Sequence, residues 1–573
     1  MSRVINNIFE ILSPNRKKIF FFLCFLMIIS TIAEVLGIGL ILPLIYTLTN
    51  QNFFEKFPQL EYFNSILGYP DTQSLLIISI LSLFIIYVLK NLFLVYYYFT
   101  EGKFIYFTQE ETSRNLFSTI LKKDYSFHLQ NNSSKFINKL KTELGYFSNA
   151  VNSAMILISE IFIVIGLSSF LLFYNIKIFI IIFLIFSALI ILYHLIVQKL
   201  LIKLSKIRTQ KEIQRIKYLQ EGFGGVKDIK TFTRENYFLE KYFNLSEILA
   251  NVYYKVHVIQ RIPKSYFEVT AIFILFSLIY YLSLKDDYTY ILPTLGIYTA
   301  AAFKLLPSVN KIVNTINTFK FVENSVQSIY DEIKNDLSTS NNKEYPNKNI
   351  SIEFQNISFK YKKDGEKIIQ NLSFKIPNSK NLIITGKTGS GKSTLIDLIL
   401  GLQSPTEGKI LVNNVELELN SKNWFKNIGY VGQNVFLFDD NINQNITLRS
   451  EKDLDVNWLS KVYEMSELTN FIEQLPQKDL TTIGERGLNI SGGQKQRIGI
   501  ARAIYKKPQV LILDESTNSL DLNTEKKVIE NLLENFKDKV IIMISHRENL
   551  VKYFDQQLSY EDGKFKLKEF KKV

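Results

Sequence analysis

The 573-residue sequence predicts a polytopic α-helical membrane domain fused to a soluble α/β domain that carries a phosphate-binding loop. Three observations predict this fold. Every long apolar segment lies within the first 320 residues, short β-like runs alternate with helical runs in the remainder, and a glycine-rich loop follows one of those runs. We place the membrane domain at residues 1–334, a polar linker at 335–349 and the α/β domain at 350–573.

Composition excludes several classes of protein. Hydrophobic residues make up 47% of the chain and charged residues 21%, which excludes disorder and a collagen-like fibre. The single cysteine, Cys24, lies in an apolar run and cannot form an internal disulfide. A net charge of +13 could indicate a nucleic-acid binder. The places along the chain where the basic residues lie explain this net charge better. We therefore expect no nucleic-acid partner.

Six segments are long and apolar enough to cross a bilayer, because roughly 20 helical residues span a hydrocarbon core of about 30 Å. A buried soluble helix would explain one such segment but not six. The first segment is too long for a cleaved signal peptide and lacks a small-residue cleavage site. The segments are residues 19–48, 74–99, 151–174, 176–198, 266–284 and 291–310.

The polar stretches between apolar segments are predicted to continue the helices outside the membrane. No proline occurs between Pro70 and Pro263, and a proline inside a helix costs about 3 kcal/mol. The second segment can therefore run unbroken over Ser74–Lys123, roughly 75 Å of helix and more than twice the bilayer core. Stretches 101–141 and 199–241 are the expected extensions.

The orientation follows from the basic residues. The polar connections on one side of the membrane hold 22 Lys and Arg, and those on the other side hold three. Because positive charge is retained on the cytoplasmic side, we expect the N-terminus and, after six crossings, the α/β domain to be cytoplasmic. The basic connections are residues 1–18, 101–141 and 199–241, and the others are 49–73, 175–177 and 285–290.

A nucleotide site is predicted from the pattern G-x-x-x-x-G-K-[ST] at residues 386–393. The pattern lies between an apolar strand, Asn381–Thr385, and an apolar helix, Thr394–Leu402, which is the context it requires. Its glycines let backbone N–H groups wrap the phosphates, Lys392 reaches the β- and γ-phosphates, and the Ser393 hydroxyl ligates Mg²⁺. The expected ATP ligands here are Gly386, Lys387, Thr388, Gly389, Ser390, Gly391, Lys392, Ser393 and Thr394.

A second acidic element follows in the run Val510–Glu515. Its four apolar residues predict a buried strand that places Asp514 at the carboxyl end, where it can hold Mg²⁺ through water. Glu515 can then polarise the attacking water. A strand that merely ends in two capping acids is the alternative in isolation, but the phosphate loop upstream favours the catalytic interpretation.

The motif Ile490-Ser491-Gly492-Gly493-Gln494 lies between these elements. The set resembles the ATP-binding-cassette (ABC) ATPases, with Ile490 where that family usually has leucine. The resemblance covers nearly all of residues 350–573 and implies further roles by position. It assigns catalysis to Glu515, His546 and Gln433, Mg²⁺ binding to Ser393, Gln433 and Asp514, adenine stacking to Tyr361, and ATP contacts to Ser491, Gly492, Gly493, Gln494 and the D-loop residue Asp521.

The same resemblance implies a homodimer that uses ATP and Mg²⁺. In the family, the motif that residues 490–494 match is called the signature, and the signature of one subunit caps the nucleotide held by the phosphate loop of the other. This sequence contains one phosphate loop and one signature, so we expect that it cannot complete a site alone. Because the essential residues are all present, both sites of the dimer are expected to hydrolyse ATP.

A six-helix domain followed by a cassette resembles the half-transporters of ABC exporters, whereas an importer would be expected to have its cassette on a separate chain. In the exporter fold, the tips of the cytoplasmic extensions are short coupling helices that dock on the cassettes, the second on the partner's. Breaks at Asp124–Asn132 and Glu221–Gly225 are the expected tips, and Phe436 and Phe438 could form the docking surface.

Ionisable residues inside apolar segments are costly and usually functional. The lysines among them could line a cavity for an anionic group such as phosphate or pyrophosphate, with the glutamate paired to one of them. Snorkelling of the lysines to the membrane interface is the alternative. The residues are Glu34, Lys90, Lys264, Lys304 and Lys311.

The membrane half resembles the bacterial flippases of lipid-linked oligosaccharides (PglK-type), at Glu34 with the run GIGLILPLI, at Lys90, and at residues 263–268 and 304–311. That family has arginine at several of these cations, and lysine keeps the charge but loses the bidentate fork. It also carries a short external helix where this chain has residues 50–72. The resemblance implies ATP-driven flipping of a polyprenyl-pyrophosphate-linked glycan across the bacterial inner membrane. An exporter of other lipids, drugs or peptides is the alternative, and an ATP-gated channel or regulator is a remote one.

Overall fold

The computed structural model describes residues 2–39, 65, 68, 72–174, 176–283, 291–335, 343–361, 365–448, 454–484, 490–561 and 563–570. They form two compact units. Unit 1 comprises Met1–Lys123 and Asn131–Leu337, and unit 2 comprises Asp124–Gln130 and Ser338–Val573, so unit 2 is built from two separate stretches of chain. Most of the expected external helix at 50–72 and residues 336–342 of the expected linker lie outside the described residues.

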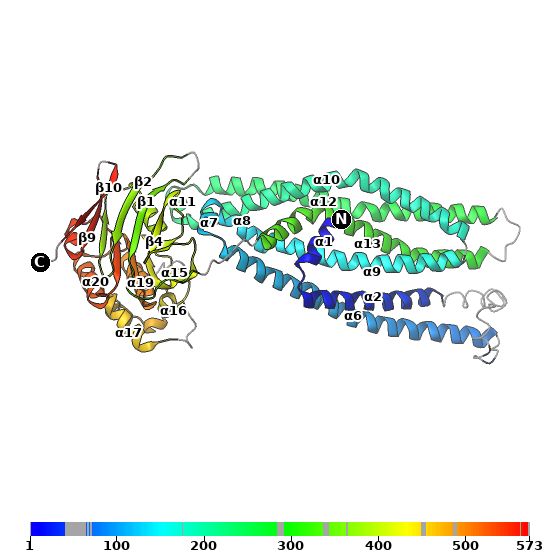
Figure 1. Cartoon of the computed structure of the whole chain (residues 1–573). Coiled ribbons are helices and arrows are strands. Elements are labelled where there is room, and N and C mark those ends of the chain that lie inside the picture. Colours follow the sequence, from blue (N-terminus) through cyan, green and yellow to red (C-terminus); the bar gives the residue numbers. More distant parts are fainter. Residues whose placement is uncertain are drawn as a thin grey trace. The chain divides into compact units, whose positions relative to one another are not determined.

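Unit 1 is a bundle of long helices that lie side by side (Figure 1). Among the described residues, four helices are long and apolar enough to cross a membrane: Pro14–Gly37, Leu76–Lys122, Ser133–Leu172 and Ile176–Gly224. The fifth and sixth predicted segments lie in α12 and α13. The elements are α1 (Ser2–Ile11), α2 (Pro14–Gly39), α6 (Thr72–Lys122), α8 (Ser133–Asn138), η2 (Lys139–Glu143), α9 (Leu144–Tyr174), α10 (Ile176–Gly224), α11 (Val226–Thr231), α12 (Glu235–Ser283) and α13 (Ile291–Lys334).

The polar extensions are helical, as predicted. Helix α6 begins and ends within two residues of the predicted range. Helix α10 ends at Gly224, inside the predicted break, and α11 follows it. Prolines do not end the helices, because Pro263 lies inside α12 and Pro307 inside α13. The fifth apolar segment is therefore the second part of a longer helix.

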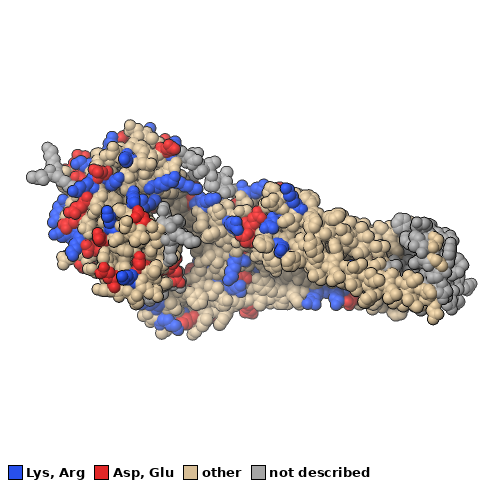
Figure 2. All heavy atoms as spheres, turned by 90° about the horizontal axis from the view of Figure 1, so that it is seen from below, with Lys and Arg blue, Asp and Glu red and all other residues tan. Residues whose placement is uncertain are grey.

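Large apolar side chains cover the outside of unit 1. Phe84, Leu92 and Ile196 are each more than 60% exposed. Water would solvate such a surface poorly, whereas the hydrocarbon core of a bilayer solvates it well. Figure 2 shows a broad stretch of the bundle without charged side chains, as a lipid-facing surface requires.

The described residues of unit 2 form two sheets. The first is antiparallel, in the order β2-β1-β4-β5, and the second has the order β10-β9-β3-β8-β7-β6 with parallel pairing from β9 to β6. Because the carboxyl ends of parallel strands meet at one edge, β3 and β7 bring the phosphate loop and Asp514 together. The strands are β1 (Ile352–Phe359), β2 (Ile369–Ile376), β3 (Leu382–Thr385), β4 (Glu407–Val412), β5 (Val415–Glu416), β6 (Ile428–Val431), β7 (Val510–Asp514), β8 (Val540–Ile544), β9 (Gln556–Glu561) and β10 (Lys564–Glu569).

The helices of unit 2 pack around these sheets (Figure 1). Trp424 is fully buried, and its Nε1 donates to the carbonyl oxygen of Ile399 at 2.9 Å, which fixes α15 on α14. The helices are α7 (Tyr125–Gln130), α14 (Lys392–Leu400), α15 (Lys422–Asn427), α16 (Ile442–Thr447), α17 (Val456–Met465), α18 (Thr469–Glu473), η5 (Lys478–Leu480), α19 (Gly492–Tyr505), α20 (Leu522–Asn535) and η7 (Glu548–Tyr553).

Candidate functional site

The phosphate loop connects β3 to α14. Gly389 and Gly391 have φ angles of 83° and 88°, a left-handed backbone that favours glycine. At Gly386 an added Cβ would come within 2.8 Å of the Cβ of Tyr560, so a larger residue does not fit. The glycines therefore permit the backbone path by which N–H groups can surround a phosphate.

Lys392 lies folded back over the loop. Its Nζ donates to the carbonyl oxygens of Gly386 and Lys387, at 2.9 Å each. The hydroxyl of Ser390 is buried without a hydrogen-bond partner, while Ser393 is exposed. An unpartnered donor beside a buried ammonium group fits a phosphate ligand, which would supply the missing acceptors.

Two adjacent carboxyl groups lie at the end of β7 without a full counter-charge. Asp514 is 6% exposed, and burial, followed by the charges of Glu515 and Asp397, raises its pKa to about 6. The described residues contain no group of three His, Cys, Asp or Glu that could hold a metal ion. The oxygens of Ser393 and Asp514, completed by phosphate oxygens and water, nevertheless suit Mg²⁺, which favours such hard ligands and would relieve the charge.

Three side chains contact the carboxylate of Glu515. Gln433 Nε2 and Asn518 Nδ2 donate to its Oε2 at 2.9 and 3.2 Å, and His546 Nε2 lies 3.0 Å from its Oε1. Its φ of 49° is unusual for a residue with a side chain, because the chain turns sharply as β7 ends. The structure thus brings together the three residues that the sequence marks as catalytic. It adds Asn518, whose only signal in the sequence is its position three residues after Glu515.

Tyr361 lies beside the first turn of α14. Its hydroxyl is 3.1 Å from Thr394 Oγ1, and its ring packs edge-on against Phe359 with the centroids 5.0 Å apart. The ring is 53% exposed, which leaves surface on which a base could stack.

The signature residues begin α19. Ser491 Oγ accepts from the backbone N–H of Gln494, whose Oε1 accepts from the backbone N–H of Ser491. A Cβ on Gly493 would lie 3.0 Å from the carbonyl oxygen of Ser519, so the D-loop (residues 519–521) packs on the signature. Asp521 caps α20, and the backbone N–H groups it accepts from lower its pKa. Among the described residues, no hydrogen bond joins the signature to the phosphate loop of the same chain.

The first expected coupling helix, α7, belongs to unit 2. Asn420 Nδ2 donates to Asp124 Oδ1, just before α7, at 2.7 Å. Burial raises the pKa of Tyr125, and the negative charge of Asp397 raises it further. At the second expected tip, the aromatic rings of Phe223 and Phe232 flank α11 and are 77% and 69% exposed.

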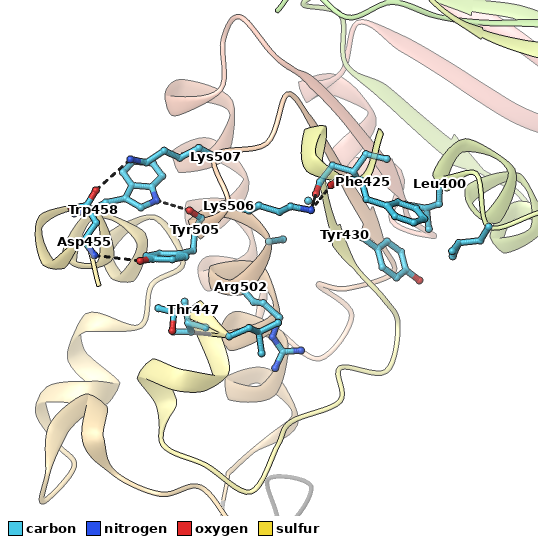
Figure 3. A pocket seen from close by; sticks show the side chains of 16 residues that line it. Leu400, Phe425, Tyr430, Thr447, Asp455, Trp458, Arg502, Tyr505, Lys506 and Lys507 are labelled. Carbon is cyan, nitrogen blue, oxygen red and sulfur yellow. Dashed lines mark hydrogen bonds and ion pairs between the residues drawn. The ribbon is translucent and has the colours of Figure 1, made fainter. Parts of the chain in front are cut away.

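A pocket of about 700 Å³ opens in unit 2 beside β6, α16, α17 and the end of α19 (Figure 3). Figure 3 shows Phe425 and Trp458 on its walls, and Trp458 Nε1 donates to the carbonyl oxygen of Tyr505 at 2.9 Å. Arg502 also lines the pocket and donates to the carbonyl oxygen of Phe436 at 2.9 Å. The aromatic residues expected to form a docking surface thus adjoin a pocket outside the phosphate loop.

Glu34 accepts hydrogen bonds from both Lys90 and Lys304 in the membrane unit. The Lys304 bond is 2.6 Å long. The side chains of Glu34 and Lys90 are 12% and 6% exposed, and that of Lys304 is 38% exposed. The glutamate therefore pairs with two lysines, where the sequence suggests one.

The other two membrane lysines also have carboxylate partners. Lys311 donates to Glu160 on α9 at 2.5 Å, and Lys264 lies 3.8 Å from Glu268, one turn along the same helix. The sequence alone does not single out Glu160. These pairs leave less free positive charge than the four lysines suggest.

Two family descriptions match the chain. One, for the ABC transporter transmembrane region, matches residues 3–290, and the other, for the ABC transporter, matches residues 369–518. The chain belongs to the ABC transporters. The second match spans this ABC transporter's phosphate loop, signature and Glu515.

Relatives extend the comparison. The ABC transporter is 34% identical to a Rickettsia bellii protein that is named as an export ATP-binding/permease protein. The match covers 45% of this chain and 42% of that protein. The matched part of the chain thus spans less than half the length of that relative. The ABC transporter is 26% identical to an ATP-dependent lipid A-core flippase of Photobacterium profundum, over 78% of this chain and 77% of that protein.

A solved structure of a bacterial Atm1-family ABC exporter with ATP bound has the same fold. The TM-score is 0.79 at 19% sequence identity, and the match covers 95% of this chain and 94% of that one. The ABC transporter therefore has the exporter fold, a helical membrane domain fused to an ABC ATPase domain.

Proposed function

We propose that two copies of this chain form an ABC exporter that hydrolyses ATP at two shared sites. The proposed cargo is an anionic lipid, with a pyrophosphate-linked oligosaccharide lipid as the leading candidate, carried across the bacterial inner membrane. The observation that supports hydrolysis most strongly is the convergence of Gln433, Asn518 and His546 on Glu515, next to Asp514.

In this proposal Glu515 orients and polarises the attacking water. Gln433 and Asn518 donate to one carboxylate oxygen of Glu515, and His546 lies beside the other. The orientation of this carboxylate is therefore fixed before a nucleotide binds. A fixed acceptor positions the water for in-line attack without reorganisation during the reaction.

The phosphate loop supplies the positive charge. Lys392 can exchange its two carbonyl partners for phosphate oxygens, which accept more strongly because they are charged. Ser393, Asp514 and Gln433 would hold Mg²⁺. When bound, that ion neutralises charge on the phosphate oxygens.

The proposed homodimer completes the site. The signature of a second copy would cap the nucleotide, which agrees with the lack of hydrogen bonds between signature and phosphate loop among the described residues. The exposed aromatic residues beside α11 match the apolar walls of the pocket in Figure 3. We propose that α11 of one copy docks in that pocket of the other.

The anionic cargo is proposed from the membrane cations. Lys90 and Lys304 share one carboxylate, so within the described part of the membrane unit this cluster has one more positive than negative charge. The lipid A-core flippase relative supports a lipid cargo. Because Lys264 and Lys311 are paired, export of other lipids, drugs or peptides remains the alternative.

The test is ATP-dependent flipping in proteoliposomes. A fluorescent polyprenyl-pyrophosphate oligosaccharide is loaded, and its change of leaflet is followed for the wild type and for Glu515→Gln. Movement with the wild type alone is expected. Robust ATP hydrolysis without a change of leaflet by the lipid would refute the proposed cargo. Flipping at an equal rate with Glu515→Gln would refute the proposal that hydrolysis at Glu515 drives transport.

A further inference from the structure

Glu34 joins three helices of unit 1. It lies on α2, Lys90 lies on α6 and Lys304 lies on α13, and both ammonium groups donate to its carboxylate. Among the described residues, one negative charge thus faces two positive charges, and Glu34 and Lys90 lie in helices that are long and apolar enough to cross a membrane. An uncompensated charge in such a place is unfavourable, which favours the binding of an anion beside the cluster.

The two lysines are held unequally. Lys90 is 6% exposed, and its Nζ also lies 4.8 Å from the centre of the Tyr87 ring. A Cβ on Gly37 would be only 3.0 Å from that ring, so α2 and α6 pack closely here. Lys90 is therefore fixed by a carboxylate, an aromatic face and tight helix packing.

Lys304 is the accessible member of the cluster. Its side chain is 38% exposed, and within the described residues Glu34 is its only ion-pair partner. Helix α13 packs mainly on α9, α10 and α12, and it makes little contact with α2. The ion pair between Lys304 and Glu34 is consequently a main link between α2 and α13. Because these two helices share little packed surface, the ion pair can break without disturbing much of the packing between them.

We propose that Glu34 is an exchangeable counter-ion, which an anionic cargo group of the phosphate class displaces from Lys304 while Lys90 stays on Glu34. This inference rests on the proposed function. After the exchange, Glu34 pairs with Lys90 and a phosphate group of the anion pairs with Lys304, so each ammonium group of the cluster has its own negative partner. The exchange also removes this ionic link between α2 and α13, so the binding of cargo can change how these two helices are held together.

Binding of farnesyl pyrophosphate to the full-length protein in lipid nanodiscs, without ATP, tests this exchange. Glu34→Gln removes the competing carboxylate and should tighten binding at least about five-fold, the low end of coupling between linked sites. Glutamine keeps an oxygen that can accept from Lys90, which limits the disturbance. Basal ATP hydrolysis and the melting temperature of each variant report folding.

Two double variants form a matched pair, because each has the same net charge at the cluster as the wild type. Glu34→Gln with Lys90→Gln leaves the accessible Lys304 free and should keep the tighter binding. Glu34→Gln with Lys304→Gln leaves only the enclosed Lys90 and should lose it. Equal binding by the two doubles, or unchanged binding by Glu34→Gln alone, would overturn the proposal.

Two further probes identify what carries the anion. Competition by inorganic pyrophosphate would show that a free anion is enough, and competition limited to farnesyl pyrophosphate would assign the site to a lipid headgroup. Equal competition by farnesol, which has no anion, would overturn the exchange. Because the readout needs no transport, failure of ATP-driven flipping with this binding pattern intact would refute the proposed function alone.

Discussion

Replacing Asp397 by asparagine should stabilise unit 2 at neutral pH. Asp397 lies on α14, and burial raises its pKa from 3.8 to about 6. The folded state therefore holds this proton more tightly than the unfolded state, and stability falls as the pH rises between the two values. The loss is complete above about pH 6, and asparagine, which does not ionise, avoids it.

The size of the stabilisation by Asp397→Asn follows from the raised pKa of Asp397. A shift of about two units corresponds to about 3 kcal/mol, and partial contact of the carboxylate with water reduces this to about 1–2 kcal/mol. For a unit of this size, each kcal/mol changes the melting temperature by about 2–4 °C. Asp397→Asn should therefore raise it by about 3–6 °C at pH 8 and by about half as much at pH 5.

Tryptophan fluorescence of the full-length protein provides the assay. The sequence contains two tryptophans, Trp424 and Trp458, and both lie in unit 2, so their emission reports its unfolding. Asp538→Asn, which changes an exposed aspartate, is the control and should have no such effect. An equal gain at pH 5 and pH 8, or destabilisation at pH 8, would refute the reasoning.

Three other substitutions test the site and its support. Glu515→Gln should lower ATP hydrolysis at least about 100-fold while a fluorescent ATP analogue still binds, and near-normal turnover would exclude Glu515 as the group that activates water. Asn518→Ala should lower kcat about 10-fold or more with little change in KM, because it removes a hydrogen bond to a charged group, and a change confined to KM would argue against this role. Trp424→Ala should destabilise unit 2 by about 3–5 kcal/mol in denaturant unfolding followed by Trp458, and a loss below about 1 kcal/mol would mean that α15 does not depend on this contact.

The ATPase unit could be anticipated closely because its chemistry is local. Residues 386–393 contain a whole phosphate loop, and the apolar run before Asp514 predicts the buried strand that the structure shows as β7. Gln433 and His546 come from distant parts of the chain, and only the family resemblance placed them beside Glu515. Asn518 belongs to none of the ABC motifs recognised in the sequence, so only the structure shows its contact with Glu515.

The membrane unit was harder to anticipate. Whether two ionisable residues pair across helices depends on how each helix is rotated and how far it is shifted, and uniformly apolar segments carry little signal for either. The pairing of Lys311 with Glu160 and the second lysine on Glu34 therefore escaped prediction. Pro263 did not end its helix, because neighbouring helices in a membrane bundle offset the local cost of proline.

The discontinuity of unit 2 has a practical consequence. The chain passes between the two units three times, at residues 123–124, 130–131 and 337–338. A fragment starting at Ser338 would lack α7 and leave Asn420 without Asp124, so a cut at the linker does not yield the natural cassette. Chimeras that exchange cassettes should therefore carry residues 124–130 with them.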